Sequence, residues 1–284
     1  MNKKSLTVIG GDSRMIYAGK ELEKKGFDVF YHGFDDDKGV SCVDINKACL
    51  GDYIVLPLPS TYDIKNINAP FSKNKIPADS KLASLLEGRP VFCAMKERLI
   101  QADEAWEKVN LIDYYKNEDF ILKNADATAF ATELIIQKEL KLSLKDTQIL
   151  VLGFGRVGKA CAKALSKCGA RITVGARRES DFREIDKLGF FSENSTDIKL
   201  FKNYKIIINT IPALILCEDV IKRLNKDTVV IDLASKSGGV DFESCRKYGI
   251  SSLHATGLPG KYCPERAGKI IEEIISDFIK EDAM

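Results

Sequence analysis

The chain contains the stretch Thr147-Gln148-Ile149-Leu150-Val151-Leu152-Gly153-Phe154-Gly155-Arg156-Val157-Gly158, in which an apolar β-type segment runs into the pattern G-x-G-x-x-G. A sequence of helical type, residues 159–168, follows it. This order gives each glycine a task. Gly153 permits the tight strand-to-helix turn, Gly155 lets a pyrophosphate approach the backbone, and Gly158 lets the helix lie close on the strand. The stretch predicts a Rossmann dinucleotide-binding unit, and a Rossmann unit without a nucleotide is the alternative.

The next expected strand, residues 171–176, ends in a sequence that bears on the choice of cofactor. NAD sites usually end this strand with Asp or Glu, which accepts hydrogen bonds from the ribose 2′-hydroxyl. Here Arg177-Arg178-Glu179-Ser180 begins 19 residues after Gly158. Because a guanidinium can clamp a 2′-phosphate that an acid would repel, we predict NADP, while Glu179 keeps NAD open. The residues predicted to bind the cofactor in these two segments are Gly153, Gly155, Arg156, Val157, Gly158, Arg177, Arg178 and Ser180.

The composition excludes several classes of protein. Lys and Arg (43) nearly balance Asp and Glu (41) among 284 residues, so we expect no nucleic-acid partner. The first apolar run, Leu6-Thr7-Val8-Ile9, is too short for a signal peptide, and no apolar run is long enough to span a membrane. Eight cysteines without a C-x-x-C pair and only two histidines predict free thiols and no metal site. We therefore expect a cytoplasmic protein without a membrane partner.

Expected strands and helices alternate along the whole chain, which predicts parallel sheets with right-handed βαβ crossovers. We predict an α/β fold of two doubly wound parallel-sheet domains joined by a long helix, the C-terminal one being the NAD(P)-binding Rossmann domain. The predicted parts are an N-terminal substrate domain of Rossmann or flavodoxin type (1–124), an interdomain helix (125–142), an NADP-binding domain (143–263) and a C-terminal helix that packs back between the domains (264–284). The expected strands are 6–9, 28–31, 53–56, 90–93, 120–122, 148–152, 171–174, 206–208, 229–232 and 251–253.

Three segments after the glycine loop are expected to reach the carboxyl edge of the second sheet, where doubly wound folds bind ligands. Asn209-Thr210-Ile211-Pro212, four predicted cofactor-binding residues, would line the nicotinamide ribose. Asp232 and Lys236 follow the next strand, and His254 and Lys261 follow the last one. We predict Asp232, Lys236, His254 and Lys261 as catalytic candidates.

Each of these residues also has a structural interpretation. Asn209 can cap a turn, and Asp232 can hold a loop through backbone N–H groups. A structural role suits His254 as well as catalysis does. Lys236 and Lys261 can be ordinary solvated lysines, although two lysines on adjacent loops would suit an anionic substrate.

The N-terminal domain offers further cationic and hydroxyl groups. The segment Gly10-Gly11-Asp12-Ser13-Arg14 follows the first strand but lacks a third glycine at the dinucleotide spacing, so it predicts a substrate-binding or structural turn. Lys96 follows the strand 90–93, and Ser60 follows the strand 53–56. A cleft between these groups and those of the second domain would fit a small dicarboxylate. The predicted substrate-binding residues are Arg14, Ser60, Lys96, Lys236 and Lys261, of which Lys96 is also a catalytic candidate.

Taken together, these motifs resemble the A subunits of dipicolinate synthase from endospore-forming bacteria. The resemblance covers nearly the whole chain in register, and the combination of G-G-D-x-R, N-T-I-P, D-L-A-S-K and G-L-P-G-K is specific. The matching segments begin at Val8, Leu56, Val151, Val174, Ile208, Ile231, Gly239, Gly257 and Ala267.

The resemblance implies NADP-linked oxidation of dihydrodipicolinate to dipicolinate (pyridine-2,6-dicarboxylate) in the cytoplasm of the mother cell during sporulation. It also implies a partner, the flavoprotein-like B subunit of dipicolinate synthase, and a homo-oligomer is left open. The protein would then mainly hold two rings face to face and bind two carboxylates.

The chain departs from the family pattern at residues 127–131, where A-T-A-F-A replaces a P-T-A-E-G-type sequence and its acid. Two other functions therefore stay open. One is an NADP oxidoreductase similar to shikimate or amino-acid dehydrogenases, which share the two-domain plan. The other is a non-catalytic NADP-binding subunit of a flavoprotein complex.

Overall fold

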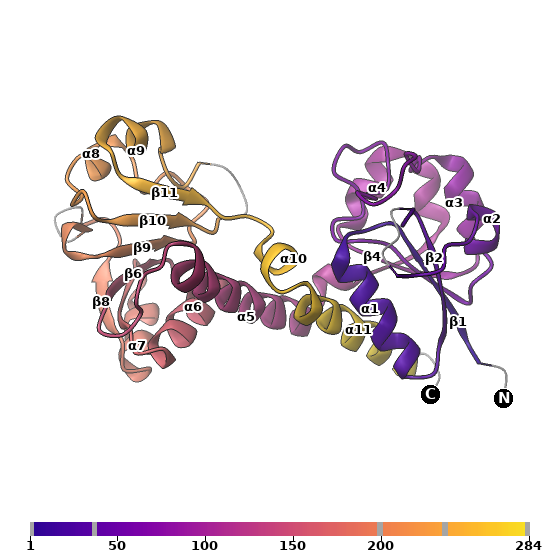
Figure 1. The fold of residues 1–284 in the computed structure, drawn as a ribbon, viewed down its shortest axis with the longest axis horizontal. Helices are drawn as coiled ribbons and strands as arrows, with labels where there is room; N and C mark the ends of the chain where they lie inside the picture. The colour runs from indigo at the N-terminus through magenta and orange to yellow at the C-terminus, as the bar shows by residue number, and fades with distance from the viewer. Residues whose placement is uncertain (1–2, 36–38, 198–200, 235–237, 282–284) are drawn as a thin grey trace. The chain divides into compact units, whose positions relative to one another are not determined.

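Two parallel β-sheets organise the chain (Figure 1). The structure is a computed structural model and describes residues 3–35, 39–197, 201–234 and 238–281. One unit comprises the residues up to Asn124 together with those from Cys263 onward, and the other comprises Ala125–Tyr262. The prediction of two parallel-sheet α/β domains with a C-terminal Rossmann domain is confirmed.

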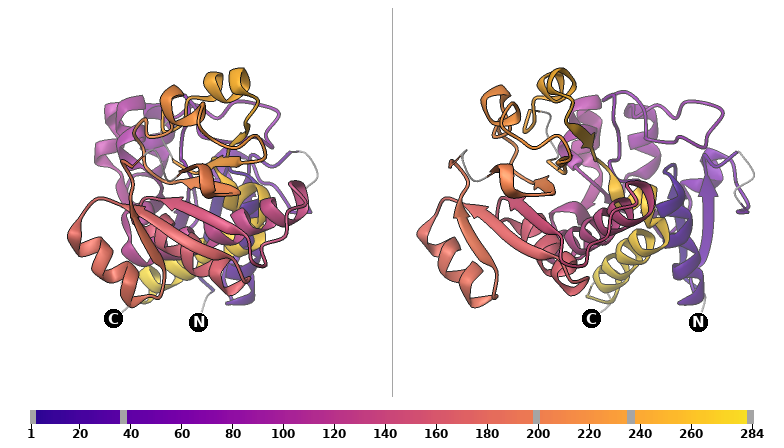
Figure 2. Two further views of the ribbon diagram at one scale, coloured as in Figure 1. Left: turned by 90° about the vertical axis from the view of Figure 1, so that its left-hand side faces the viewer. Right: turned by 60° about the vertical axis from the view of Figure 1, so that its left-hand side comes forward.

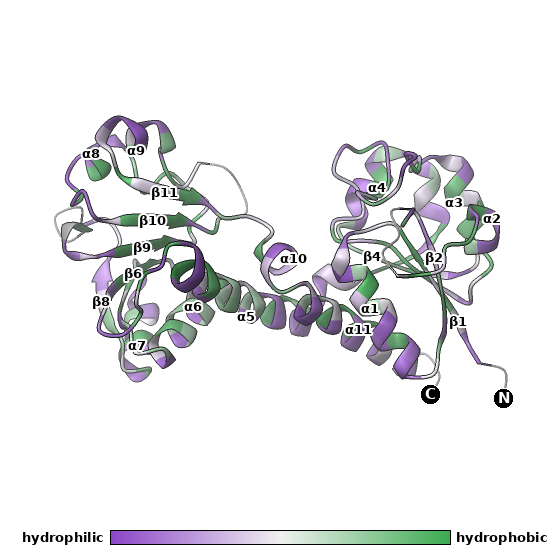
Figure 3. Cartoon of the chain, in the orientation of Figure 1, coloured by the Kyte–Doolittle hydropathy of each residue, from purple (hydrophilic) through white to green (hydrophobic). Residues whose placement is uncertain are grey.

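The first unit is built on a five-stranded sheet of order β2-β1-β3-β4-β5, in which all paired strands are parallel. Its strands are β1 (Ser5–Ile9), β2 (Asp28–His32), β3 (Tyr53–Val55), β4 (Pro90–Cys93) and β5 (Asn110–Asp113). Its helices are α1 (Ser13–Lys24), α2 (Ile45–Ala48), α3 (Ser80–Leu86), α4 (Lys96–Ala102) and α11 (Pro264–Glu281), with short 3₁₀ turns at Glu104–Lys108 and Tyr114–Lys116. Hydrophobic residues concentrate on the strands in both units (Figure 3), as parallel sheets covered by helices require.

The C-terminal helix α11 lies beside α1 in the first unit (Figure 2). The two helices approach closely at Gly268, where a Cβ atom would lie 2.5 Å from the Arg14 carbonyl oxygen. Glu272 is only 2 % exposed and pairs with Lys25 of the first unit at 2.6 Å. The buried face of the helix predicted to pack back between the domains (264–284) therefore packs against α1 of the first unit.

The second unit contains a six-stranded parallel sheet of order β11-β10-β9-β6-β7-β8. Because β6 has β7 on one side and β9 on the other, the strand order reverses at β6, as in the Rossmann fold. The strands are β6 (Gln148–Leu152), β7 (Arg171–Ala176), β8 (Phe191–Asn194), β9 (Ile206–Asn209), β10 (Val229–Asp232) and β11 (Ser251–His254). The helices are α6 (Arg156–Lys167), α7 (Glu179–Lys187), α8 (Glu218–Ile221), α9 (Phe242–Tyr248) and α10 (Leu258–Tyr262).

The segment between the two sheets differs from the prediction. Residues 120–122 were expected to form a strand, but they lie in α5 (Glu118–Leu134), which crosses the boundary between the units. The Phe120 N–H donates to the Asn117 side chain at 3.0 Å, which starts a helix where a short apolar run alone is ambiguous. The predicted interdomain helix (125–142) is therefore the later part of α5, followed by a π-helical turn at Ile135–Glu139.

A substitution at Lys141 tests how this helical segment ends. Lys141 is exposed and has a φ of 53°, in the left-handed region that favours glycine. We expect Lys141→Gly to stabilise the protein by about 0.5–1 kcal/mol, since it removes backbone strain. The matched control Lys163→Gly, inside α6 and also exposed, should destabilise it by about 1 kcal/mol. Thermal unfolding midpoints that move in the same direction for both variants would contradict this assignment.

Candidate functional site

The glycine loop joins the end of β6 to the start of α6 with very little space. Gly153 has a φ of +97°, which L-residues with side chains rarely adopt. A Cβ atom at Gly158 would lie 2.1 Å from the Gly153 carbonyl oxygen, so no side chain fits there. A Cβ atom at Gly155, in contrast, would meet no atom within 4 Å. The first and third glycines are thus required by the fold, and the second leaves open space where the backbone must admit a ligand.

The first turn of α6 fits an anionic group. Gly155, which has no side chain to cap the helix, is the N-cap of this 12-residue helix. Uncapped N–H groups at a helix N-terminus, together with the helix dipole, attract phosphate. Arg156 is exposed and Val157 is half-buried in the same turn. The donor set and the open space at Gly155 therefore fit the pyrophosphate of a dinucleotide.

Asn209 and Asp232 form a buried pair at the ends of adjacent strands β9 and β10. Both residues are 0 % exposed, and the Asn209 Nδ2 donates to Asp232 Oδ1 at 2.8 Å. The Asn209 amide also donates to the Ile211 carbonyl at 3.0 Å and accepts from the Ile211 N–H at 3.1 Å. The Ala234 N–H donates to Asp232 Oδ1 at 3.2 Å. This pair fixes the loops that follow both strands.

The neighbouring Thr210 ties the same loop to the glycine loop. Its hydroxyl and its N–H donate to the Leu152 carbonyl at 2.8 and 2.9 Å. A Cβ atom at Gly153 would lie 2.5 Å from the Thr210 Oγ1. Thus Asn209, Thr210 and Ile211 position the loop beside the glycine turn, and Pro212 follows them on the chain.

Asp232 keeps one oxygen unused. Its Oδ2 is buried and has no hydrogen-bond partner within the described part of the chain. A buried acceptor without a partner is costly, so such an atom suits a group that receives a donor when a ligand binds. Asp232 therefore holds the loop with Oδ1, while its Oδ2 accepts no hydrogen bond from the described residues.

The two arginines at the end of β7 are in different states. Both are exposed, but the Arg178 guanidinium donates to both carboxylate oxygens of Asp181 at 3.0 and 3.1 Å. This hydrogen bond raises the pKa of Arg178. Arg177 makes no ion pair within the described residues, and Ser180 is exposed in the first turn of α7. Asp181, which the sequence analysis did not single out, thus orients one of the two predicted phosphate clamps.

The predicted catalytic residues of the last strands are exposed. His254 ends β11, and its ring lies 5.6 Å from the ring of Phe242. Lys261 lies in the short helix α10 and is exposed. Lys236 lies outside the described residues.

Arg14 lies at the carboxyl end of β1 in the first unit and is nearly buried, with 11 % of its side chain exposed. Its Nε donates to both Asp12 oxygens at 2.9 and 3.1 Å, and its Nη2 donates to Asp12 Oδ2 at 2.8 Å and to the Leu58 carbonyl at 2.6 Å. Burial alone would lower the pKa of Arg14, but the hydrogen bonds and the charge of Asp12 outweigh it and raise the pKa. The predicted substrate-binding arginine is therefore a charged group in a fixed orientation.

Lys96 lies in the same unit, at the start of α4, and its side chain is half-buried. The Asp113 carboxylate at the end of β5 accepts hydrogen bonds at 3.1 Å from the N–H groups of Met95, Lys96 and Tyr115. Met95 has a φ of 62°, a left-handed conformation in which glycine would be expected. Asp113 therefore holds the turn that carries Lys96.

Ser60 differs from the prediction, because its hydroxyl is engaged within the protein. Ser60 is 0 % exposed, donates from its Oγ to the Pro57 carbonyl at 3.1 Å and accepts from the Ala94 N–H at 3.0 Å. Its own N–H donates to the Ala94 carbonyl at 3.2 Å. Ser60 thus joins the loop after β3 to the loop after β4, and a hydroxyl in this state supports the site from behind.

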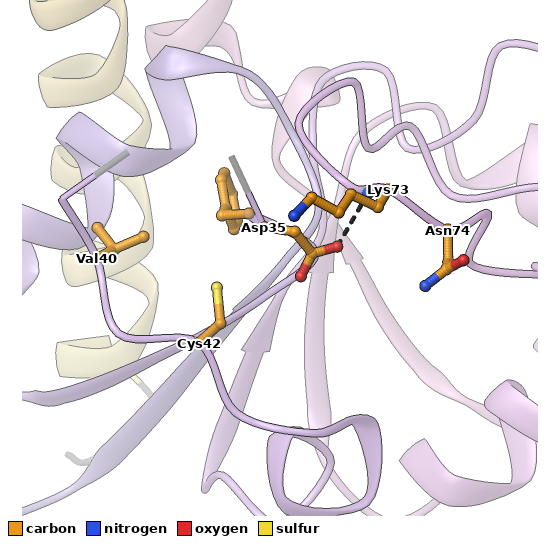
Figure 4. A pocket seen from close by; sticks show the side chains of 6 residues that line it. Asp35, Val40, Cys42, Lys73 and Asn74 are labelled. Carbon is orange, nitrogen blue, oxygen red and sulfur yellow. Dashed lines mark hydrogen bonds between the residues drawn. The ribbon is translucent and has the colours of Figure 1, made fainter. Parts of the chain in front are cut away.

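The pocket drawn in Figure 4 lies elsewhere in the first unit. It has a volume of about 480 Å³ and is lined by Phe34, Asp35, Val40, Cys42, Lys73 and Asn74. The Lys73 N–H donates to Asp35 Oδ2 at 2.9 Å, so this carboxylate holds a loop. No residue predicted for the site lines this pocket.

No cluster that could hold a metal ion occurs among the described residues. No helix of the described chain is both long and apolar enough to cross a membrane.

Two family models match the two units. Residues 5–115 match the model of the N-terminal domain of the dipicolinate synthase A subunit, and residues 141–249 match "Alanine dehydrogenase/PNT, C-terminal domain". The second unit is therefore a pyridine-nucleotide-binding domain, which agrees with the geometry of its glycine loop.

Whole-chain comparisons give the same result. The A subunit of dipicolinate synthase from Bacillus subtilis (strain 168) is 29% identical, over 97% of this chain and 96% of its own. The crystal structure of the same subunit from Bacillus subtilis matches with a TM-score of 0.84 and 27% identity over 99% of this chain and 97% of its own. The crystal structure of the A subunit from Bacillus halodurans matches with a TM-score of 0.83 and 27% identity over 97% of both chains.

Substitution of two glycines separates the fold from the binding of a nucleotide. Gly155→Ala should leave the unfolding temperature nearly unchanged, because its Cβ meets open space, but should weaken nucleotide binding at least tenfold by blocking the pyrophosphate. Gly158→Ala should lower the unfolding temperature, because its Cβ would overlap the Gly153 carbonyl. Calorimetric titration with nucleotide and thermal unfolding check both. Equal nucleotide affinity in Gly155→Ala and wild type would contradict the placement of the pyrophosphate.

Proposed function

Because the chain belongs to the family of dipicolinate synthase A subunits, we propose that it oxidises dihydrodipicolinate to dipicolinate with NADP⁺ as the hydride acceptor. In this reaction a ring carbon of the substrate gives a hydride to the nicotinamide and a neighbouring position loses a proton. The products are NADPH, a proton and the aromatic dicarboxylate. Formation of the aromatic ring makes the step favourable, so the protein mainly has to bind and orient the two rings.

The observation that carries the proposal is the glycine loop. Its open space at Gly155 and the N-terminus of α6, with a glycine as N-cap, fit the pyrophosphate of the cofactor, which supplies the hydride acceptor when bound. The loop of Asn209, Thr210 and Ile211 is fixed beside this turn and would line the nicotinamide ribose. The loops that would bind the nicotinamide half of the cofactor are therefore already held in place by hydrogen bonds within the protein.

The preference for NADP over NAD rests on the end of β7. Alanine and two arginines occupy Ala176, Arg177 and Arg178, where an acid would accept from a ribose 2′-hydroxyl. Arg177 would bind the 2′-phosphate, with Arg178 held beside it by Asp181 and Ser180 adding a hydroxyl. Glu179 belongs to the first turn of α7 and lies beyond the strand end.

The substrate would be recognised by cationic side chains, of which Lys236 lies outside the described residues. Arg14 and Lys96 of the first unit, with Lys236 and Lys261 of the second, match the two carboxylates of the substrate in charge. Asp232 and His254 are the candidates for the group that accepts the proton. The Oδ2 of Asp232, which has no hydrogen-bond partner among the described residues, supports its candidacy.

We further propose that the chain works with the flavoprotein-like B subunit of dipicolinate synthase, in the cytoplasm of the mother cell during sporulation. A second candidate function is a non-catalytic NADP-binding subunit of that complex. It is favoured by residues 127–131, where Phe130 stands in place of the family's acid. Ala127, Ala129 and Ala131 are buried, so they serve the packing of α5.

The test is NADP reduction by the purified chain, with substrate generated in situ by dihydrodipicolinate synthase, with and without the B subunit. We expect NADPH and dipicolinate to form together. Lys261→Met should lower the rate about a hundredfold without affecting NADP binding, because the lysine would contact the substrate and not the cofactor. The exposed Lys145→Met is the matched control. NADP binding without turnover, even with the B subunit present, would favour the non-catalytic function.

Cofactor choice is tested at the end of β7. Arg177→Ser should raise the KM for NADP about tenfold or more and leave the KM for NAD nearly unchanged, since only NADP carries the 2′-phosphate. Arg183→Ser, an exposed arginine on the same helix α7, serves as the control. If both KM values rise equally in Arg177→Ser, the arginine does not recognise the phosphate.

A further inference from the structure

The Arg14 guanidinium is held by more hydrogen bonds than a surface ion pair usually makes. Two of the three guanidinium nitrogens of Arg14, Nε and Nη2, make all of its hydrogen bonds within the described residues, to Asp12 and to the Leu58 carbonyl. The third nitrogen, Nη1, has no partner there, and it is not one of the buried unpartnered atoms. Solvent therefore reaches Nη1 through the 11 % of the side chain that is exposed.

The groups that hold Arg14 are themselves fixed. Leu58 belongs to the loop after β3, which Ser60 joins to the Ala94 backbone by two hydrogen bonds and to the Pro57 carbonyl by a third. Asp12 is fixed because it also caps α1, with its Oδ1 accepting from the Arg14 N–H at 3.0 Å. The guanidinium plane thus cannot rotate without breaking several contacts, and the direction of the Nη1 hydrogens is set before any ligand arrives.

This arrangement suits the recognition of a carboxylate. A planar guanidinium binds a carboxylate through N–H groups in its own plane, and prior ordering lowers the entropy lost on binding. The partially exposed Nη1 is the edge that remains for such a contact.

We propose that Asp12 is a positioning residue for the substrate: it holds the Arg14 guanidinium so that Nη1 donates to one carboxylate of the dicarboxylate. The inference rests on the proposed function, because it takes the dicarboxylate as the ligand. It gives a role to the acid of the G-G-D-x-R motif, whereas the charged residues predicted to bind the substrate are all cations. The Asp12 carboxylate orients Arg14 and does not itself contact the substrate.

The two tasks of Asp12 can be separated by one substitution. Asn is as good an N-cap as Asp, so Asp12→Asn keeps the cap of α1 but replaces the bidentate carboxylate with a neutral amide. Asp79 is the matched control, because its Oδ1 caps α3 by accepting from the Leu82 N–H at 3.1 Å, and it makes no ion pair among the described residues. Asp79→Asn therefore makes the same chemical change at a cap without an arginine.

The probes are dipicolinate (pyridine-2,6-dicarboxylate) and picolinate (pyridine-2-carboxylate), titrated calorimetrically into the full chain loaded with NADP. In Asp12→Asn we expect the dipicolinate Kd and the substrate KM to rise about tenfold, with kcat changing less. Picolinate, which can place its one carboxylate on the remaining cations, should bind nearly as before, so the preference for two carboxylates falls. NADP affinity should stay constant, and Asp79→Asn should behave as wild type.

Each other result has a definite meaning. Equal dipicolinate affinity in Asp12→Asn and wild type overturns the inference and leaves the proposed function intact. A wild-type chain that neither binds dipicolinate nor reduces NADP overturns both. If Asp12→Asn unfolds, Arg14→Lys replaces it, because lysine keeps the charge opposite Asp12 but lacks the fork. Loss of the preference for dipicolinate over picolinate in that variant supports the inference, and retention overturns it.

Discussion

Both units depend on the same constraint: in a parallel sheet every strand ends at one edge, so the loops that follow the strands are brought together there. In the second unit this edge gathers the glycine loop, the Asn209 loop and Asp232, and the order of strands reverses at β6. In the first unit it gathers the Arg14 turn and the turn that carries Lys96. Residues far apart in the sequence can therefore act on one ligand.

Aspartates make these loops rigid. Asp12, Asp113 and Asp232 each lie at or just after the end of a parallel strand, and each accepts backbone N–H groups from the loop that follows or adjoins it. A carboxylate in this position satisfies amides that no strand or helix reaches, and it offers a second oxygen for another partner. For Asp12 that partner is Arg14, whereas Asn209 shares Oδ1 of Asp232 with the Ala234 N–H, and Oδ2 has no partner among the described residues. The negative charges of these aspartates thus hold the loops of the protein in place, whether or not a ligand is bound.

The sequence was sufficient for the features that depend on local pattern. The glycine loop, the apolar strands on either side of it and the arginines after β7 follow from spacing and residue type, and the structure has each of them. Strands β5 (Asn110–Asp113) and β8 (Phe191–Asn194) were missed, because both are short edge strands of mixed polarity. The engagement of Ser60 and the pairing of Arg178 with Asp181 were also missed, since they depend on which loops meet in space or on the rotamer of an exposed side chain. The role of Asp12 as the N-cap of α1 could have been predicted, because Asp is a preferred residue directly before a helix.

The first unit is assembled from both ends of the chain, and this has a consequence for its biosynthesis. Its helix α1 ends at Lys24, whereas α11, which covers it and supplies Glu272 to Lys25, begins at Pro264, 240 residues later. At roughly 5–20 residues per second a ribosome needs on the order of 10–50 s to bridge that gap. The nucleotide-binding unit is continuous in sequence and can close in the meantime. The side of α1 that α11 covers stays uncovered until residues 264–281 have been synthesised, so the first unit is completed after the second.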